Sequence, residues 1–164
     1  GHRRVALIKG IEKNFDAAER LRGYSTAMKD NGGEIDPRLE FAGNFTEASG
    51  YDAVKSLLAI SPRPTAIFAC NDSMAIGALS ALRDVGIQVP DEVALAGFDD
   101  IPIASYLTPS LTSVEVGIQN LGVRAIETVI HAVRNKNTHH KQTTILETTL
   151  SLRESCGCTN PQNQ

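Results

Sequence analysis

Four short loops carry most of the side chains that could bind a small molecule, and each follows an apolar run. They comprise residues 9–15, 43–45, 70–72 and 98–100. Together they offer aromatic rings, amides, carboxylates and a lysine. Aromatic rings stack on the apolar faces of sugars, while amides and carboxylates pair with hydroxyl groups. The set therefore favours sugar recognition, although Asn71, Asp72 and Asp99 could equally serve only as caps of helices and turns.

The familiar catalytic motifs are absent from the chain. There is no G-x-G-x-x-G after a strand, no G-x-x-x-x-G-K-[ST] and no G-x-S-x-G, so dinucleotide, P-loop and serine-hydrolase chemistry are not indicated. Asp99 and Asp100 could form a carboxylate pair for acid–base catalysis. Adjacent residues seldom converge on one substrate, so a role in the loop is favoured. We expect no enzyme activity and no cofactor.

Two histidines and two cysteines near the end of the chain superficially suggest a metal site. They are His139, His140, Cys156 and Cys158. The histidines lie in a polar stretch, and the cysteines lack the C-x-x-C spacing of zinc sites. A solvated turn and a frayed chain end are therefore favoured, and no metal is expected.

The composition is that of one globular domain, with 164 residues, 41% hydrophobic and 21% charged. A net charge of -3 without blocks of like charge argues against DNA binding by this chain itself. No apolar run approaches the roughly 20 residues that span a bilayer, and the run at 5–8 is too short for a signal peptide. Three cysteines at 70, 156 and 158 fit reduced thiols in a cytoplasmic protein.

Apolar runs alternate with amphipathic stretches through the first hundred residues. The runs are residues 5–8, 39–42, 65–69 and 93–97. Because they are apolar on both faces, they predict buried parallel strands with helices on both sides. The expected helix caps are Asn14 or Asp16, then Thr46, then Asn71 or Asp72, with ends near Gly32, Ile60 and Gly86. We therefore expect an α/β fold in which helices flank a parallel sheet through right-handed crossovers.

Beyond Gly97 the alternation stops and two prolines punctuate a loop. The elements expected after it are a strand at 112–116, a helix at 118–134, a polar turn at 135–140 and a last strand near 144–152. The helix carries apolar residues at helical spacing. The tail from Cys156 onward is expected to be disordered.

Several segments, taken together, resemble the effector domain of the lactose-repressor/galactose-repressor (LacI/GalR) family. In order along the chain they read GHRRVA, RLRGY, GNFTEASGY, RPTAIF, NDSMAIGA, VPDEV, GFDD, LTPSLTSV and RES. A single motif of this kind carries little weight, but the ordered series runs from Gly1 to Ser155.

Members of that family join an N-terminal helix-turn-helix and hinge helix to a two-lobed core related to periplasmic binding proteins. The resemblance implies that this chain begins where the second lobe begins and forms a flavodoxin-like lobe of the periplasmic-binding-protein-like type I fold. Residues 1–110 and 143–155 would form the effector-binding subdomain. Residues 111–142 would be a crossover strand and helix of the largely missing first subdomain, which leaves the apolar stripe of 118–134 without its partner. Residues 156–164 would be the disordered tail.

The resemblance also implies which residues contact the effector. Arg20 matches the arginine of the family's R-L-x-G motif, Asn71 the asparagine of N-D-x-M-A, and Asp99 the first acid of G-[FY]-D-[DN]. From position alone, Arg20 could instead be a solvated charge on its helix.

Further positions follow from the same alignment of motifs. Phe45 falls where some relatives stack a base or a sugar, and Lys13 and Phe15 occupy loop positions that tune ligand choice. Ile76 and Tyr106 fall where family members bury side chains against the second subunit of a homodimer.

The function implied by the resemblance is that of the effector-sensing and dimerising part of a bacterial transcription repressor. A sugar or related metabolite would shift the population of two lobe arrangements, and operator DNA would be bound only through the helix-turn-helix outside this chain. The alternative is a periplasmic sugar-binding protein of an ABC transporter. A flavodoxin-like enzyme or signalling domain would need a phosphate-binding loop or acidic pocket after the first strand, which residues 9–11 do not offer.

Overall fold

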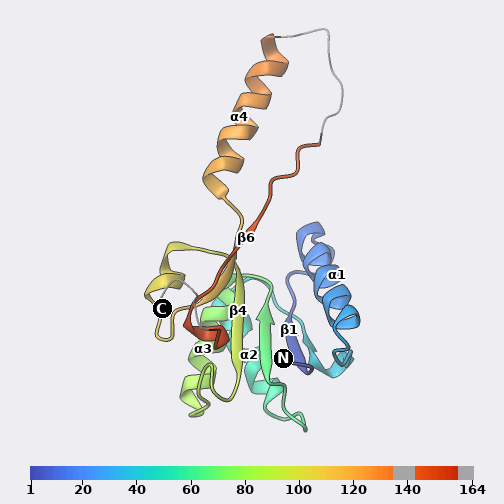
Figure 1. Cartoon of the computed structure of the whole chain (residues 1–164), viewed down its shortest axis with the longest axis vertical. Coiled ribbons are helices and arrows are strands. Elements are labelled where there is room, and N and C mark those ends of the chain that lie inside the picture. Colours follow the sequence, from blue (N-terminus) through green and yellow to red (C-terminus); the bar gives the residue numbers. More distant parts are fainter. Residues whose placement is uncertain (135–142, 159–164) are drawn as a thin grey trace.

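The computed structural model describes residues 1–134 and 143–158 of the chain. Figure 1 shows one α/β lobe from which a long helix projects. The strands are β1 (Val5–Ile8), β2 (Glu40–Phe41), β3 (Ala66–Ala69), β4 (Ala94–Asp99), β5 (Thr112–Glu115) and β6 (Thr149–Ser151). The helices are α1 (Phe15–Asp30), α2 (Glu47–Leu57), α3 (Asp72–Asp84) and α4 (Ile118–Arg134), with 3-10 turns η1 (Pro37–Leu39), η2 (Pro102–Tyr106) and η3 (Glu154–Cys156). None of these helices is long and apolar enough to span a membrane.

The six strands form one sheet in the order β2-β1-β3-β4-β5-β6. The first five are parallel, and β6 runs antiparallel to β5. All four apolar runs predicted as strands lie in this sheet, so the predicted α/β architecture is confirmed. The run at 39–42 is shorter than predicted, because Asp36 caps a 3-10 turn that begins at Pro37 and takes up Leu39.

The helices begin at residues predicted as caps. The side chains of Asn14, Thr46 and Asn71 accept hydrogen bonds from the backbone N–H groups of Ala17, Ser49 and Met74, respectively. Each bond satisfies one of the four N–H groups that a helix start leaves without a partner. These starts bring the beginnings of α1, α2 and α3 to the same edge of the sheet.

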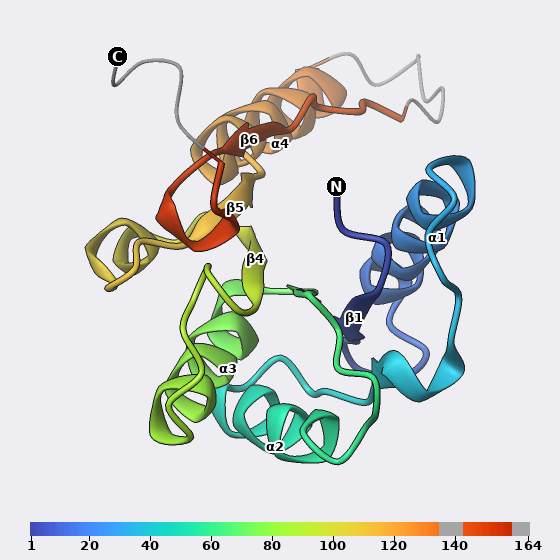
Figure 2. The same cartoon turned by 60° about the horizontal axis from the view of Figure 1, so that its bottom comes forward.

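Helices cover both faces of the sheet, α1 on one side and α2 with α3 on the other (Figure 2). The core between them is made of apolar side chains with almost no exposed surface, among them Leu7, Ile8, Ile67, Met74, Leu82 and Leu95. Burying each such side chain stabilises the fold by about 1.5–3 kcal/mol. Gly50 and Gly77 let α2 and α3 approach closely, because a Cβ on either would collide with backbone of the other helix.

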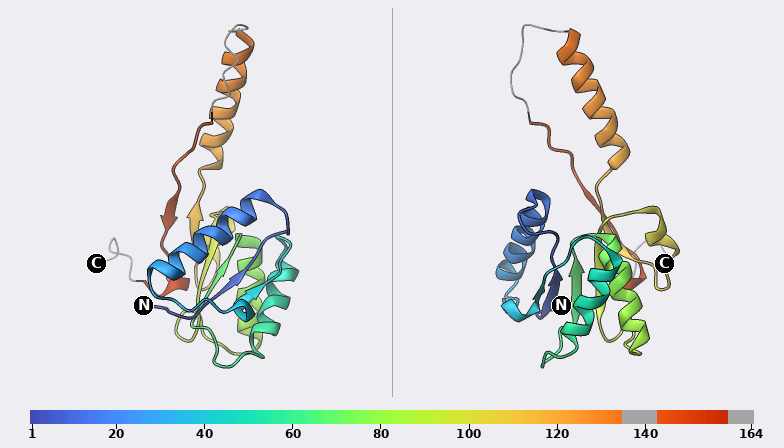
Figure 3. Two further views of the ribbon diagram at one scale, coloured as in Figure 1. Left: turned by 90° about the vertical axis from the view of Figure 1, so that its right-hand side faces the viewer. Right: turned by 180° about the vertical axis from the view of Figure 1, so that it is seen from behind.

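Helix α4 follows β5 and stands away from the lobe in both views of Figure 3. None of its residues is buried, and its apolar side chains are exposed, with Ile126 at 61% and Val129 at 58%. Strand β6 is shorter than the stretch 144–152 predicted for it. The polar turn predicted at 135–140, including His139 and His140, lies outside the described residues.

Strand β5 is hydrogen-bonded to β4 along its length, and Thr112 and Ser113 are buried. Residues 111–142, which include β5, are assigned from the sequence to the missing first subdomain. That division stays a prediction, although β5 is part of the sheet described here. The chain also remains structured beyond Ser155, where a disordered tail was expected to begin. Residues 154–156 form η3. This turn is held against the sheet because the Ser155 hydroxyl donates to the Leu95 carbonyl and accepts from the Thr112 N–H. Residues 159–164 of the predicted tail lie outside the described part.

Candidate functional site

The carboxyl edge of the parallel strands gathers most of the predicted binding residues. Ligands bind beyond this edge in open α/β sheets. Residues 9–14 follow β1, Asn71 follows β3 and Asp99 ends β4. Arg20 comes from the second turn of α1 and reaches across the sheet toward the last two.

Arg20 contacts several of the other groups at this edge. One terminal nitrogen, Nη1, donates to the Cys70 carbonyl oxygen at 2.5 Å, and the other, Nη2, lies 3.4 Å from Oδ1 of Asp99. The guanidinium lies over the Phe98 ring, with Cζ 4.0 Å from the ring centroid, and 6.0 Å from that of Phe45. Only 17% of the Arg20 side chain is exposed. Such a guanidinium is held in one orientation before any ligand arrives, so a solvated surface charge is not its role.

Asp99 is a half-buried carboxylate on strained backbone. Its φ is 107°, and that of Asp100 is 51°, conformations that cost on the order of 1–3 kcal/mol each in a residue with a Cβ. Burial raises the pKa of Asp99, and the Arg20 charge opposes that rise. These two positive φ angles turn the chain sharply at the end of β4, so the Asp99 carboxylate lies at the edge of the sheet.

A fully buried carboxylate, Asp72, supports this turn. It accepts hydrogen bonds from the Ser113 hydroxyl at 2.6 Å and the Ile101 N–H at 2.9 Å. Burial raises the pKa of Asp72, although both hydrogen bonds act in the opposite direction. Asp100 is held in turn by Arg153 and Ser151, each at 2.7 Å. Asp72 is therefore the anchor of the Asp99 loop rather than a helix cap.

Asn71 has two structural partners. Its Oδ1 caps α3, and its Nδ2 donates to the Phe45 carbonyl oxygen at 3.1 Å. Phe45 has a φ of 67°, so this bond stabilises a strained loop residue. Asn71 thus couples two loops of the edge. Asn71 therefore caps α3, as its position suggested, and also lies in the cluster of predicted binding residues.

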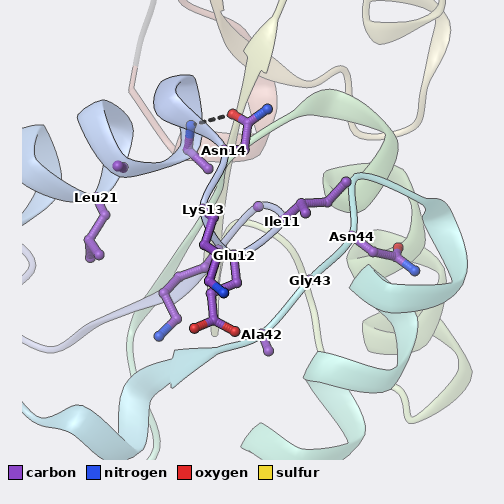
Figure 4. A pocket seen from close by; sticks show the side chains of 12 residues that line it. Ile11, Glu12, Lys13, Asn14, Leu21, Ala42, Gly43 and Asn44 are labelled. Carbon is purple, nitrogen blue, oxygen red and sulfur yellow. Dashed lines mark hydrogen bonds between the residues drawn. The ribbon is translucent and has the colours of Figure 1, made fainter.

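The remaining predicted residues divide between two hollows on either side of the start of α1. Lys13 lines a pocket of about 400 Å³ with Ile11, Glu12, Leu21 and Asn44 (Figure 4). Phe15 is 77% exposed and lines a separate hollow of about 480 Å³ with Arg20 and Phe98. The structure therefore gathers Arg20, Asn71, Asp99 and Phe45 into one cluster. It places Phe15 in a hollow beside Arg20, and Lys13 in a pocket that none of the four cluster residues lines.

Phe98 and Asp72 lie in loops that the sequence predicted to bind a ligand, but neither was named among the effector contacts. Phe98 precedes Asp99 on β4, and its ring contacts Arg20. Its position could have indicated this role, because Phe98 lies at a strand end directly before Asp99, a residue predicted to contact the effector. Asp72 offered a weaker signal, because its burial depends on the distant Ser113.

Comparison with known proteins identifies the family of this domain. A family model described as a periplasmic binding protein-like domain matches residues 1–156. The chain belongs to this family. It is part of such a domain, of the kind found in LacI-family repressors, as the resemblance of its motifs predicted.

Two relatives show the match in detail. The ribose operon repressor of Haemophilus influenzae is 36% identical over 155 residues, which cover 94% of this chain and 46% of that protein. The ribose operon repressor of Escherichia coli K12 is 41% identical over 133 residues, which cover 81% and 40%. Among solved structures, the transcriptional regulator CelR in complex with cellobiose matches with a TM-score of 0.89 at 37% identity, covering 94% of this chain and 47% of that one.

These matches are to transcriptional regulators, not enzymes. The chain spans less than half the length of each of these proteins. This periplasmic-binding-protein-like domain is therefore present only in part, and the lobe described here is the part that carries Arg20, Asn71 and Asp99.

The two residues predicted for a dimer interface belong to α3 and η2, elements that lie on the opposite side of the lobe from α1 (Figure 1). Ile76 is half-buried on α3, and Tyr106 is 82% exposed at the end of η2. Ile103, also on η2, is 52% exposed. In the described residues, 1–134 and 143–158, no group of three or more metal-ligating side chains is found.

Proposed function

We propose that this chain is the effector-binding and dimerising part of a bacterial transcription repressor, and that it binds a sugar or related metabolite at the carboxyl edge of its sheet. The observation that carries the proposal is the Arg20 cluster, in which a guanidinium is held between the Phe98 ring and the Asp99 carboxylate. A charged donor and acceptor beside aromatic faces suit a polyhydroxylated ring.

Each group of the cluster has capacity left for a ligand. A guanidinium has five N–H donors, and two of its nitrogens are used here toward Cys70 and Asp99. Within the described residues, only Oδ1 of Asp99 has a hydrogen-bond partner, which leaves Oδ2 for a hydroxyl group. Asn71 would contact a ligand by exchanging its bond to the Phe45 carbonyl, so ligand binding would also move the Phe45 loop.

The unpartnered α4 supports a second lobe closing over this edge. The helix follows β5 at the carboxyl end of the sheet, and β6 returns to it. Its exposed apolar side chains would be buried against residues outside this chain, consistent with relatives more than twice as long. Ligand enclosed between two lobes would bias their arrangement, and DNA would be bound by a separate part. A repressor of this kind would act in the cytoplasm, as a homodimer through the Ile76 and Tyr106 side.

Calorimetry on the longer, two-lobed protein tests the proposal. The panel would contain ribose and cellobiose, which the names of the matched regulators suggest, with further pentoses, hexoses and purine bases. We expect one ligand to bind and Arg20→Met to weaken its affinity at least about tenfold, since a hydrogen bond to a charged group is worth roughly 1.5–3 kcal/mol.

The matched control is Arg22→Met. Arg22 lies two residues further along α1, where its side chain is 75% exposed and pairs with Glu19. It should leave affinity unchanged. Equal affinity of wild type and Arg20→Met for a ligand that binds would remove Arg20 from the site, and the absence of any ligand in the panel would argue against sugar sensing.

A periplasmic sugar-binding protein is the second candidate, because the matched family model is named for such proteins. The same cluster would serve either function. A mobility shift with DNA fragments from around the parent gene separates the two, since only a repressor with a DNA-binding part should retard one of them.

A further inference from the structure

Cys156 and Cys158 lie together at the amino edge of the sheet, on the far side of the lobe from the Arg20 cluster. Cys156 ends η3, and Gly157 follows with a φ of 70° and donates its N–H to the Glu154 carbonyl at 3.0 Å. This left-handed residue reverses the chain. The N–H of Cys158 consequently points at Sγ of Cys156, 3.4 Å away.

The two thiols have different surroundings. Cys156 is half-buried, and burial acts to raise its pKa, but the polar groups of Thr112 and Cys158 outweigh burial, so the pKa is lowered. The Cys158 N–H donates to the Cys156 sulfur, which also lies 3.4 Å from the Arg153 carbonyl oxygen. Cys158 is exposed, and its contact with Cys156 raises its pKa. The pKa values of the two thiols therefore move apart, with the lower one on Cys156.

A groove on the surface leads to Cys158. It has a volume of about 640 Å³ and passes Glu154, Gly157 and Cys158, and its other wall comes from α3 and residues 87–90. Cys156 does not line this groove, but its sulfur is half-buried rather than enclosed in the core. The third cysteine contrasts with them. Cys70 is fully buried in the core, where burial raises its pKa, so it should be unreactive.

We propose that Cys156 and Cys158 form a redox-active dithiol that closes reversibly to an intramolecular disulfide by exchange with small-molecule disulfides. The Cys156 thiolate attacks one sulfur of RS–SR, a mixed disulfide forms, and RS⁻ leaves and takes up a proton. Cys158 then loses its proton to solvent and attacks the Cys156 sulfur, which releases the second RS⁻. The dithiol gives up two electrons and two protons, and RS–SR becomes two RSH.

A structural metal is the weaker interpretation of the same pair. Tetrahedral zinc needs four ligands, and the described residues, 1–134 and 143–158, contain no cluster of three or more metal-ligating side chains. The carboxylate of Glu154, two residues before Cys156, is already occupied, since it accepts hydrogen bonds from the Ser110 N–H and hydroxyl.

The experiment exposes the reduced protein to oxidised glutathione at neutral pH, quenches it with acid and alkylates the remaining thiols after unfolding. Wild type should lose two of its three alkylatable thiols, become lighter by two hydrogen atoms and yield a peptide linking Cys156 to Cys158. Dithiothreitol should restore all three thiols. The Cys70→Ser variant should form the same disulfide.

Two variants separate the roles of the sulfurs. Cys158→Ser should hold glutathione on Cys156 as a stable mixed disulfide, because the second attack is lost. Cys156→Ser should react at least roughly tenfold more slowly, because the thiolate is the nucleophile. Cys158 is exposed, so its variant should fold normally, which circular dichroism checks. The proposal is overturned if wild type stops at a mixed disulfide, links two copies through these cysteines, or reacts at Cys70 as fast as at Cys156.

Discussion

The guanidinium of Arg20 lies 4.0 Å from the centroid of the Phe98 ring. A partly desolvated cation–π contact of this kind is worth about 0.5–2 kcal/mol. It joins α1 to the end of β4 and keeps the charge beside Asp99, at 3.4 Å. The ring and the carboxylate are neighbours in the sequence, so one strand end supplies both the surface that orients the cation and the group that pairs with it.

The pKa of Asp99 should therefore depend on Arg20. Burial already raises this pKa above its ordinary value, and the Arg20 charge limits the rise. We expect Arg20→Met to raise it further, because the desolvated carboxylate loses its cation. Phe98→Leu should raise the pKa of Asp99 by a smaller amount, because without the ring the Arg20 guanidinium can move away from the carboxylate. Carbon-detected NMR titration of Asp99 checks both, and an unchanged pKa in Arg20→Met would contradict the pairing.

Gly77 should tolerate no side chain. A Cβ at this position would collide with the Glu47 carbonyl oxygen of α2. Separating two packed helices should outweigh the helix propensity that alanine adds, so Gly77→Ala should lower the free energy of unfolding by about 1–3 kcal/mol, measured by urea denaturation. The matched control is Gly23→Ala in α1, where a Cβ would meet nothing within 4 Å. There alanine should stabilise by about 0.5–1 kcal/mol; equal effects at both positions would contradict the close approach.

Asp36 should contribute to the loss of stability in acid. Hydrogen bonds from Arg38, with further support from Arg4 at 3.1 Å, hold the pKa of this carboxyl far below its ordinary value. A lowered folded-state pKa means that the stabilisation is complete above the pKa of the unfolded chain, about 3.9, and is lost as the pH falls below it. Asp36→Asn should therefore be less stable than wild type at pH 6, with a gap that narrows toward pH 3. Denaturation curves across this range test the prediction, which a constant gap would contradict.

Leu121 should matter only in the longer protein. It lies on the apolar side of α4 and is 53% exposed here. If a second lobe covers α4, Leu121→Ala should cost the two-lobed protein about 2–5 kcal/mol. In the 164-residue chain the change should stay within about 0.5 kcal/mol. Urea denaturation of both forms measures this difference. A small effect of Leu121→Ala in the two-lobed protein would mean that the second lobe does not cover the Leu121 side of α4.

The order of strands and helices could be predicted from the sequence, because apolar runs and capping residues are local signals. Val5–Ile8 and Ile118–Arg134 have the predicted bounds, and Asn14, Thr46 and Asn71 cap their helices. The family motifs directed attention to Arg20, Asn71 and Asp99 for the same reason. Each lies in a short run whose residue order is itself informative.

Contacts between distant segments were decided only by the tertiary structure. The position of Asp72 in the core depends on Ser113 and Ile101, and the support of Asp100 depends on Arg153, more than fifty residues further along. The 3-10 turn η3 is held in place because Ser155 bonds Leu95 and Thr112. The stacking of Arg20 on Phe98 likewise arises from the packing of α1 beside the end of β4. The contact of the Cys158 N–H with the Cys156 sulfur arises from the left-handed turn at Gly157. Local pattern determines which elements form, but the partner of a polar side chain is set by the packing that brings distant segments together.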